Sequence, residues 1–345
     1  MNHYPSNVKE KLNSIILSMA EHHWLFSKNP GHDFTRQHLG KLSFYDTMRL
    51  IISMGKGSTN DEIMDYFDLD PDLIPSQSAF CQRRRQISLS AFEYLFSEFS
   101  SSFPSTTDKF KDHCILACDG CHVVYATNSD IIEDYNKPRL IDYKGYNHMH
   151  LNGFVDVISK AFLDVVIQPG QQPDEREALH SMLDHFTPDD PQKYIITADR
   201  GYESYDLLFH CELQNLGYVF RVKSPSSPKS ILSYYASELP DDLEEFDVTI
   251  KRFFTDKATN IMKSQSDVYR YINPSKNTPH FYELLRKNHS HLYFLQFRVV
   301  KIKTAGISKT GNLLPDSVQF RHFYRKQSGR RKPEKETGYS LCANH

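Results

Sequence analysis

The sequence has no segment suited to membrane insertion or export. No run of residues approaches the roughly 20 consecutive apolar residues that a helix needs to cross a bilayer. Residues 1–23 have no basic start leading into a long apolar core and no small-residue cleavage site, so we interpret them as an amphipathic helix. We therefore expect a cytoplasmic protein with no membrane partner.

The sequence also has almost no net charge. Its 41 Lys and Arg residues nearly balance 43 Asp and Glu residues, which leaves a formal net charge of −2. A nucleic-acid surface would therefore have to be a local basic patch. Hydrophobic residues make up 39% and charged residues 24%, which is typical of a folded globular chain, and 345 residues suffice for one to three domains.

Cysteines are few and scattered. A single CxxC pair occurs, Cys118-x-x-Cys121 followed by His122, and its letters match the attachment signature of a c-type haem. Covalent haem attachment belongs to exported proteins in bacteria, and a structural zinc site would need a second ligand pair that the sequence lacks. The other interpretation is that the cysteines are small core residues of a strand and that Asp119 between them carries the chemistry.

Helical patterns dominate residues 1–105, which we predict to be a helical DNA-binding region. Capping boxes at residues 59–62 and 90–93 predict two helix starts, and Ser76 can cap a further helix.

A short helix, a turn and a basic helix in this region resemble a helix-turn-helix. Arg83, Arg84 and Arg85 would place positive charge on the second helix, so we predict that they contact DNA. The alternative, a solvated charged face on an ordinary helical bundle, stays open.

The hydrophobic pattern changes between residues 106 and 224. Three strand-like segments are followed by a helix, a strand, a helix and a strand: CILACD, HLNGFVDVI, AFLDVVIQP, DEREALHSMLDHF, KYIITAD, SYDLLFHCELQNLG and YVFRVK. A meander that leads into β–α–β units predicts an α/β fold, a mixed sheet with helices packed on its faces. No glycine-rich loop follows the first strand, which argues against a dinucleotide-binding fold.

The last third of the chain has two different patterns. Residues 225–303 alternate with a period of two in FDVTIKRFF and YFLQFRVVKIK, which predicts a β-rich segment. Residues 304–345 are basic and contain few aliphatic residues, so we expect a disordered tail.

Two aspartates follow apolar strand patterns. Asp119 ends ILACD and Asp199 ends YIITAD. Functional groups gather where loops leave a rigid sheet, and two converging carboxylates are typical ligands of Mg²⁺. A pair of such ions can activate a nucleophile and stabilise a leaving oxygen in phosphoryl transfer. Each aspartate alone would more simply cap a local turn, but the strand order favours convergence.

The segments around these aspartates resemble a known family. LACDG, HLNGFVDVISKAFLDVVIQPGQQPDEREAL and YIITADRGYESYDLLFHCELQNLGYVFRVK are similar to the core of bacterial insertion-sequence transposases of the DDE type, in the insertion-sequence-four family. The resemblance covers roughly residues 40–300. It implies a ribonuclease H-like catalytic domain and assigns the region 225–303 to a β-rich insertion before the third carboxylate.

The resemblance also implies roles for particular residues. Asp119 and Asp199 correspond to the first two catalytic carboxylates and would hold Mg²⁺ or Mn²⁺. Arg200 and Glu203 lie in the motif around the second carboxylate, where they would support the site or touch DNA. The partner would be double-stranded DNA, both transposon ends and target, with two copies acting together on synapsed ends.

The sequence departs from the family at its third carboxylate. The family supplies a Glu on a late helix, preceded by a Tyr and an Arg and followed by a Lys. Arg330 and Glu334 have the Arg-to-Glu spacing, but Gln327 and Leu341 stand at the Tyr and Lys positions. We therefore expect a truncated copy with impaired activity, unless another acid such as Glu283 completes the site. Whether a frameshift or a true product accounts for the truncation stays open.

Two functions follow from the sequence. The first is a transposase that cuts and rejoins DNA phosphodiesters, and the second is an inactive remnant that binds transposon ends. A haem or zinc protein built on Cys118 and Cys121 is the remaining alternative.

Overall fold

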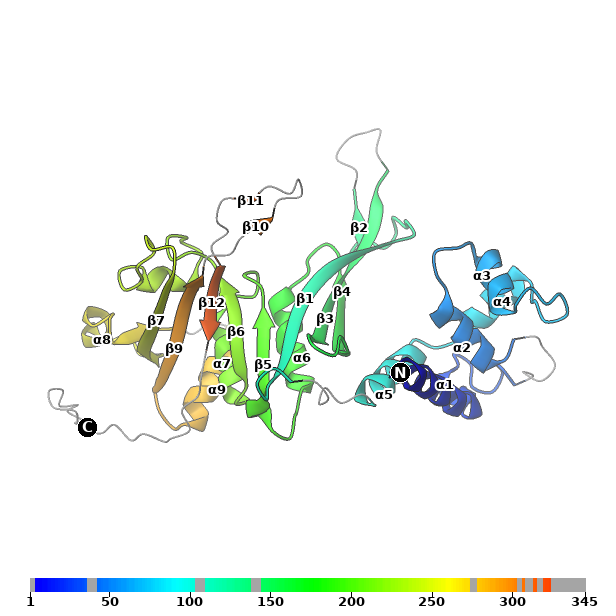
Figure 1. Cartoon of the computed structure of the whole chain (residues 1–345), viewed down its shortest axis with the longest axis horizontal. Coiled ribbons are helices and arrows are strands. Elements are labelled where there is room, and N and C mark those ends of the chain that lie inside the picture. The colour runs from blue at the N-terminus through cyan, green and yellow to red at the C-terminus, as the bar shows by residue number, and fades with distance from the viewer. Residues whose placement is uncertain are drawn as a thin grey trace. The chain divides into compact units, whose positions relative to one another are not determined.

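The computed structural model describes residues 4–35, 42–102, 109–137, 144–273 and 278–302, and the backbone of residues 306–307, 313–314 and 319–323. The chain divides into two compact units, Met1–Thr107 with Ala161–Asp164, and Asp108–Lys160 with Val165–His345 (Figure 1). Across these described residues, no helix combines the length and apolar character that crossing a membrane requires.

The described residues of the first unit that precede Thr107 form helices, and its second segment, Ala161–Asp164, contains the start of strand β4 (Phe162–Pro169). The helices are α1 (Tyr4–Glu21), η1 (His23–Phe26), α2 (Phe44–Ser53), α3 (Thr59–Tyr66), α4 (Gln77–Gln86) and α5 (Ser90–Ser101).

Serine caps fix where several of these helices begin. The capping box of α3 is formed by Ser58 with Asp61, one residue before the predicted start, because the Ser58 side chain accepts the Asp61 amide. Ser76 caps α4 as predicted. The box predicted at Ser90 is wrong, because Ser90 is already the first helical residue and Leu89 precedes it without a side-chain cap.

Two apolar clusters hold these helices together. Fully buried Phe44 and Met48 of α2 pack in one cluster with residues of α1 and α5. In the other, Leu50 of α2 meets Ile63 of α3 and Phe80 of α4. The connection from α3 to α4 spans residues 67–76, which is much longer than the three or four residues of a helix-turn-helix turn.

The second unit is built on one large sheet with helices. The strands are β1 (Cys114–Tyr125), β2 (Tyr135–Asn136), β3 (Tyr146–Asp156), β4 (Phe162–Pro169), β5 (Tyr194–Ala198), β6 (Gly217–Val222), β7 (Phe246–Thr255), β8 (Tyr269–Tyr271), β9 (Leu292–Ile302) and β12 (Gln319–Phe323). The helices are α6 (Glu175–His185), η3 (Pro191–Lys193), α7 (Tyr205–Leu213), η4 (Ile231–Tyr235), α8 (Asn260–Ser264) and α9 (Pro279–Lys287). A separate small sheet pairs β10 (Gly306–Ile307) with β11 (Leu313–Leu314).

The strand order identifies the fold class. The sheet runs β2-β3-β1-β5-β6-β12-β9-β7-β8, and β4 also pairs with β3. β1 is antiparallel to β3 but parallel to β5, and β5 is parallel to β6. This is the predicted ribonuclease H-like mixed sheet, preceded by helices and followed by a β-rich segment, so the fold-class prediction is confirmed.

Two details differ from the sequence pattern. β1 does not end at Asp119 but continues to Tyr125, because its second half stays paired with β3 after its pairing with β5 stops at Cys118. Part of the expected tail lies in the sheet, since β12 pairs with both β6 and β9. Most of residues 304–345 lie outside the described residues, and the division into four domains remains a prediction.

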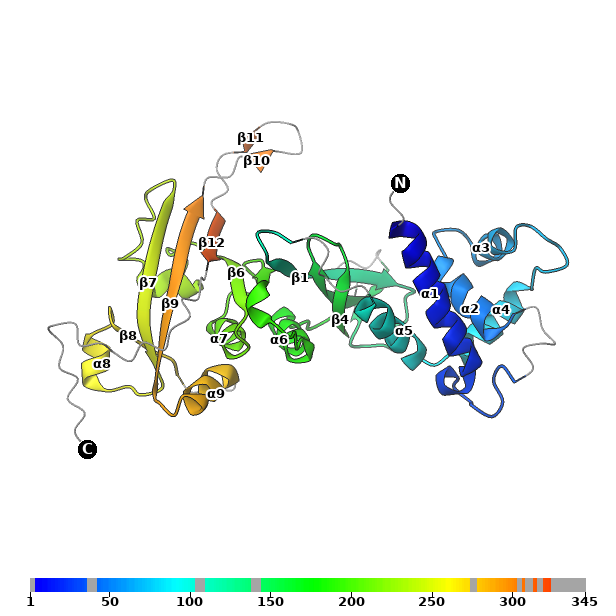
Figure 2. The ribbon, with the colours of Figure 1, turned by 60° about the horizontal axis from the view of Figure 1, so that its bottom comes forward.

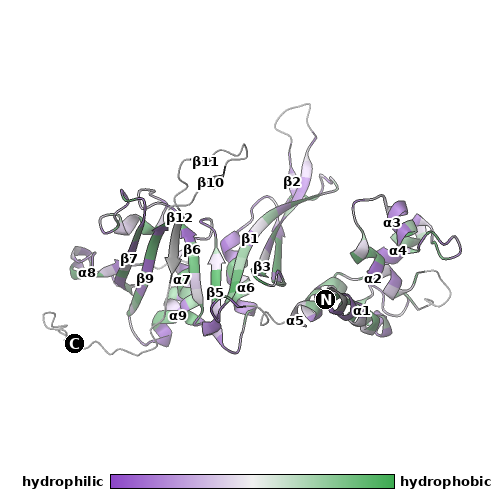
Figure 3. Ribbon diagram, in the orientation of Figure 1, coloured by the Kyte–Doolittle hydropathy of each residue, from purple (hydrophilic) through white to green (hydrophobic). Residues whose placement is uncertain are grey.

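Helices α6, α7 and α9 lie side by side along one face of the sheet (Figure 2). Phe209 of α7 is fully buried, and its ring centroid lies 5.2 Å from that of Phe254 in β7 and 4.7 Å from that of Phe281 in α9. Green hydrophobic segments alternate with purple hydrophilic ones along β7 and β9 (Figure 3). A shared apolar cluster therefore joins the β-rich segment to the helices of the core.

We expect Phe209→Ala to destabilise the second unit by about 3–5 kcal/mol, because the cavity would remove contacts from both sides of this junction. Urea unfolding followed by circular dichroism measures the change. Phe294→Ala is the matched control, since Phe294 is 49% exposed and should cost about 1 kcal/mol or less. Equal losses in the two variants would contradict a shared core at Phe209.

Candidate functional site

Asp119 and Asp199 lie next to each other in the sheet. Cys118 of β1 is the register partner of Ala198, the last residue of β5, and each is followed by an aspartate, Asp119 within β1 and Asp199 directly after β5. Both aspartates are exposed, and Asp119 lies opposite Gly153 of β3, which has no side chain to cover it. The sheet thus brings together two carboxylates that are far apart in sequence.

The turn after β5 fixes the orientation of Asp199. The Gly201 amide donates to Asp199 Oδ1 at 2.6 Å, and the Tyr202 amide donates to the Asp199 carbonyl oxygen at 3.2 Å. Arg176 Nε of α6 donates to the Gly201 carbonyl oxygen at 3.1 Å. The turn is therefore bonded both to its own aspartate and to the neighbouring helix.

A third carboxylate, Glu175, reaches the same place from the first residue of α6. A Cβ on Gly201 would lie 3.0 Å from Asp199 Oδ1 and 3.1 Å from Glu175 Oε2, so both carboxylates border one small space. Sequence reasoning missed this role, because acids in the first turn of a helix are explained by the helix dipole alone. Asp174 beside it is the N-cap, since its side chain accepts the amides of Arg176 and Glu177.

The negative charge of the site acts on two buried neighbours. Burial, with smaller contributions from the charges of Asp119 and Glu175, raises the pKa of the Cys118 thiol to about 12. Burial likewise raises the pKa of Tyr202 above its usual range, with contributions from Cys118 and from the same two carboxylates. Asp119 and Glu175 therefore act electrostatically on the same pair of side chains.

The CxxC pair is not arranged to share a metal or a haem. Cys118 is buried and Cys121 is exposed, as expected for residues three apart on a strand, whose side chains point to opposite faces. The structure therefore contradicts the haem or zinc interpretation of this pair.

Glu203 ties the turn after β5 to the end of β6. Its side chain is 1% exposed, and its two oxygens accept the Lys223 amide at 2.8 Å and Lys223 Nζ at 2.7 Å. Arg200 is exposed beside it. Glu203 thus holds a site segment in place, while the Arg200 side chain faces solvent, where it could meet a ligand.

His150 of β3 packs beside the carboxylates. It is 3% exposed, its Nε2 lies 3.4 Å from Glu175 Oε1, and its ring centroid is 4.8 Å from that of His122. A Cβ on Gly120 would collide with His150 Nε2, so only glycine fits next to Asp119 here. The imidazole therefore occupies space directly beside the backbone that carries Asp119.

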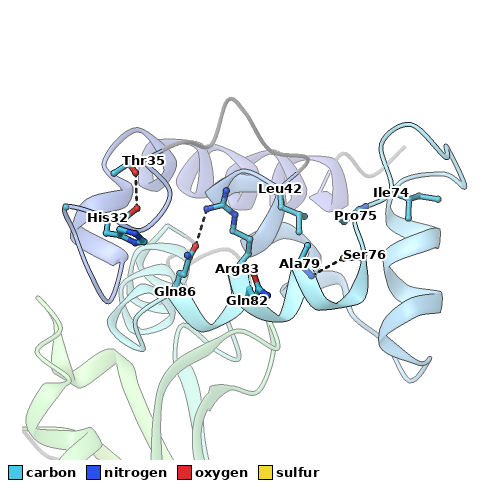
Figure 4. Close-up of a pocket in the computed structure, with 11 residues that line it drawn as sticks. His32, Thr35, Leu42, Ile74, Pro75, Ser76, Ala79, Gln82, Arg83 and Gln86 are labelled. Carbon is cyan, nitrogen blue, oxygen red and sulfur yellow. Dashed lines mark hydrogen bonds between the residues drawn. The ribbon is translucent and has the colours of Figure 1, made fainter.

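The predicted DNA-binding arginines lie in the last turn of α4, in the first unit. Arg83 is half-buried, with Nη1 donating to Gln86 Oε1 at 3.1 Å and its guanidinium 5.1 Å from the Phe34 ring centroid. It borders a hollow of about 850 Å³ next to Ser76 and Ala79 (Figure 4). Arg84 and Arg85 are exposed and can reach a ligand more freely.

Two acids late in the sequence, Glu283 and Glu334, are further candidates for a third carboxylate. Glu283 is exposed on α9, which packs against α7. Glu334 and the neighbouring Arg330 lie outside the described residues. Glu175, by contrast, borders the same small space as Asp199.

We expect Gly201→Ala to weaken the binding of Mn²⁺, because the new Cβ would press on the carboxylates of Asp199 and Glu175. Titration of Mn²⁺ followed by electron paramagnetic resonance measures the affinity, with a loss of roughly tenfold or more expected for displaced ligands. Gly31→Ala is the control, since nothing lies within 4 Å of its Cβ position. Unchanged Mn²⁺ affinity in Gly201→Ala would contradict a metal site at this place.

Comparison with known proteins places this site in a family context. A sequence model of the family described as "Transposase DDE domain" matches residues 110–329. No curated protein matches the chain. Among solved structures, the cryo-EM structure of a piggyBac transposase synaptic complex with hairpin DNA is similar with a TM-score of 0.39 and 10% identity. That match covers 80% of this chain and 49% of the other, so the chain spans about half the length of that protein.

Proposed function

Because the chain belongs to the family of transposase DDE domains, we propose that it cuts and joins DNA at the ends of an insertion sequence of the insertion-sequence-four family. The observation that supports this most is the register of β1 and β5, which sets Asp119 beside Asp199. Glu175 is our candidate for the third carboxylate, in place of the late glutamate of the family pattern.

The donor set suits a divalent metal ion, on which domains of this family depend. Asp119, Asp199 and Glu175 supply oxygen ligands, which Mg²⁺ and Mn²⁺ prefer, and the two aspartates are open to water and to a substrate phosphate. When bound, such ions would activate a water or a DNA 3′-hydroxyl and stabilise the charge of the reacting phosphate.

The residues around the carboxylates would keep them in position. The Gly201 amide orients Asp199, and the buried Glu203–Lys223 pair ties the same turn to β6. Positions of catalytic groups must be held within roughly 0.5 Å, which a turn bonded at several points can provide. Arg200, exposed next to Asp199, is placed to contact a DNA phosphate.

Removing the carboxylates one at a time tests the proposal. We expect Asp119→Asn and Asp199→Asn to reduce Mg²⁺-dependent cleavage of terminal-repeat DNA by at least about 100-fold, and Glu175→Gln to reduce it by a similar factor. Glu177→Gln, an exposed acid of the same helix turn, should cleave normally. An assay on labelled DNA with Mg²⁺ and with Mn²⁺ measures all four variants.

The outcomes of this assay separate the alternatives. If Glu175→Gln cleaves DNA normally while both aspartate variants lose cleavage activity, Glu175 is not part of the catalytic site and the two aspartates are. Binding of terminal-repeat DNA without cleavage by the unaltered chain would favour the second function, an inactive protein that binds transposon ends.

We propose in addition that Arg84 and Arg85 bind the DNA backbone, with half-buried Arg83 supporting them. The double variant Arg84→Ala/Arg85→Ala should lower the slope of log affinity against log salt by about 2, one unit for each lost phosphate contact. Fluorescence anisotropy with a labelled duplex at several salt concentrations measures this slope.

Lys9→Ala/Lys11→Ala removes the same charge from exposed positions of α1 and serves as the control. Equal effects in both double variants would indicate a general charge effect and contradict a contact at α4. Light scattering of the DNA complex tests our further expectation that two copies act together, and a single chain per complex would contradict it.

A further inference from the structure

Three histidines from three different helices meet in the helical layer. His180 comes from α6, His210 from α7 and His280 from α9, and one ring nitrogen of each lies within 4.8 Å of the others. The Nδ1 atoms of His180 and His210 are 2.9 Å apart. None of these residues belongs to the carboxylate site, and among the described residues no other group of His, Cys, Asp and Glu has this geometry.

The three rings form a compact stack. The ring centroid of His280 lies 3.9 Å from that of His210 and 4.4 Å from that of His180, with interplanar angles of 11° and 7°. His210 is 2% exposed, and the side chains of His180 and His280 are 12% and 16% exposed. The cluster is therefore largely shielded from water but open on one side.

Burial and the neighbouring rings keep two members of the cluster, His180 and His210, neutral. Burial and the nearby His280 lower the pKa of His180 to about 4 and that of His210 to about 3. At neutral pH these two imidazoles are therefore neutral, and their Nδ1 atoms share a hydrogen bond that a bound ion would replace. A neutral imidazole is the most common metal ligand in proteins.

A carboxylate next to the stack orients its rings. Asp206 of α7 is 2% exposed, and its Oδ2 lies 2.7 Å from His280 Nδ1 and 3.6 Å from His180 Nε2. Its Oδ1 accepts the amides of His280 and Phe281 at the start of α9. Metal-binding histidines usually donate their other ring N–H to such a carboxylate, which fixes the tautomer.

We propose that His180, His210 and His280 bind a transition-metal ion, with Zn²⁺ the best fit, and that this ion ties α9 to α6 and α7. Three imidazoles and one open position are a known ligand set of zinc. Binding would turn His280 out of its parallel stack, because the ring-nitrogen lone pairs lie in the ring planes and those of parallel rings do not converge. Nitrogen ligands favour Zn²⁺, Cu²⁺ or Ni²⁺ over the oxygen-seeking Mg²⁺, so this site differs in selectivity from the carboxylate site. Asp184, whose Oδ1 lies 3.2 Å from His210 Nε2, is exposed and could complete the ligand set or orient that ring.

The position of the cluster indicates a structural role. α6 and α7 belong to the helical layer of the core, and α9 leads into β9 of the β-rich segment. An ion bound by all three helices would therefore fix the β-rich segment to the core, in addition to the apolar cluster around Phe209.

Co²⁺ is the probe, because its visible absorption reports a four-coordinate site. The full chain, stripped of metal and kept in excess Mg²⁺, should bind one Co²⁺ with four-coordinate absorption, and Zn²⁺ should displace it. His280→Gln should weaken this binding at least about tenfold. His291→Gln, which alters an exposed histidine 3.0 Å from Asp256, and Asp119→Asn/Asp199→Asn should both bind Co²⁺ normally.

A second measurement does not depend on a variant that folds. X-ray absorption of the Zn²⁺-loaded unaltered chain should show about three imidazole ligands. The proposal would be overturned by a shell of oxygen ligands alone, by the absence of four-coordinate absorption, or by its loss in the aspartate double variant instead of in His280→Gln. If the three histidines form only a hydrogen-bonded stack without metal affinity, the four-coordinate absorption will be absent.

Discussion

The parallel pairing of β1 with β5 is the constraint on which the site depends. Leu116 and Ile196 are register partners and both are fully buried, so the apolar halves of the two strands set the alignment. The same alignment places two like charges, Asp119 and Asp199, side by side where the pairing stops. Solvent reduces their repulsion at this exposed end of the strands, and a divalent cation would turn it into attraction. The apolar core would therefore take a direct part in forming the proposed metal site.

The second layer around this pair consists of backbone and buried ionic contacts. Arg176 of α6 holds the Gly201 carbonyl group, and Glu203 holds the amide and the ammonium group of Lys223. This loop cannot shift without leaving the buried Glu203 carboxylate unpaired, which costs about 1–3 kcal/mol or more for a charged group. The positions of Asp199 and Glu175 are therefore linked through Gly201, although the two carboxylates come from different elements.

Sequence patterns were informative where local chemistry determines structure. The apolar runs that end in Asp119 and Asp199 predicted that these two aspartates lie on neighbouring strands. The strand period and the strand order are sufficient for this prediction. The full length of β1 was missed because CHVVY has no apolar alternation of its own and is held by pairing with β3. Glu175 and the histidine stack were missed for a related reason: His180, His210 and His280 come together only when three helices pack, and no local spacing connects them.

Helix α6 links the two groups of side chains that the fold assembles. It begins with Glu175 beside Asp199 and carries His180 in contact with α7 and α9. Its start is fixed by the Asp174 cap and by the Arg176 contact with Gly201. Because a helix turn is stiff, any ligand that fixes His180 against α7 also restricts the position of Glu175. Through α6, a histidine-bound ion would therefore reduce the freedom of the carboxylate site without touching it, which is the effect expected of a structural metal in a site that needs preorganised ligands.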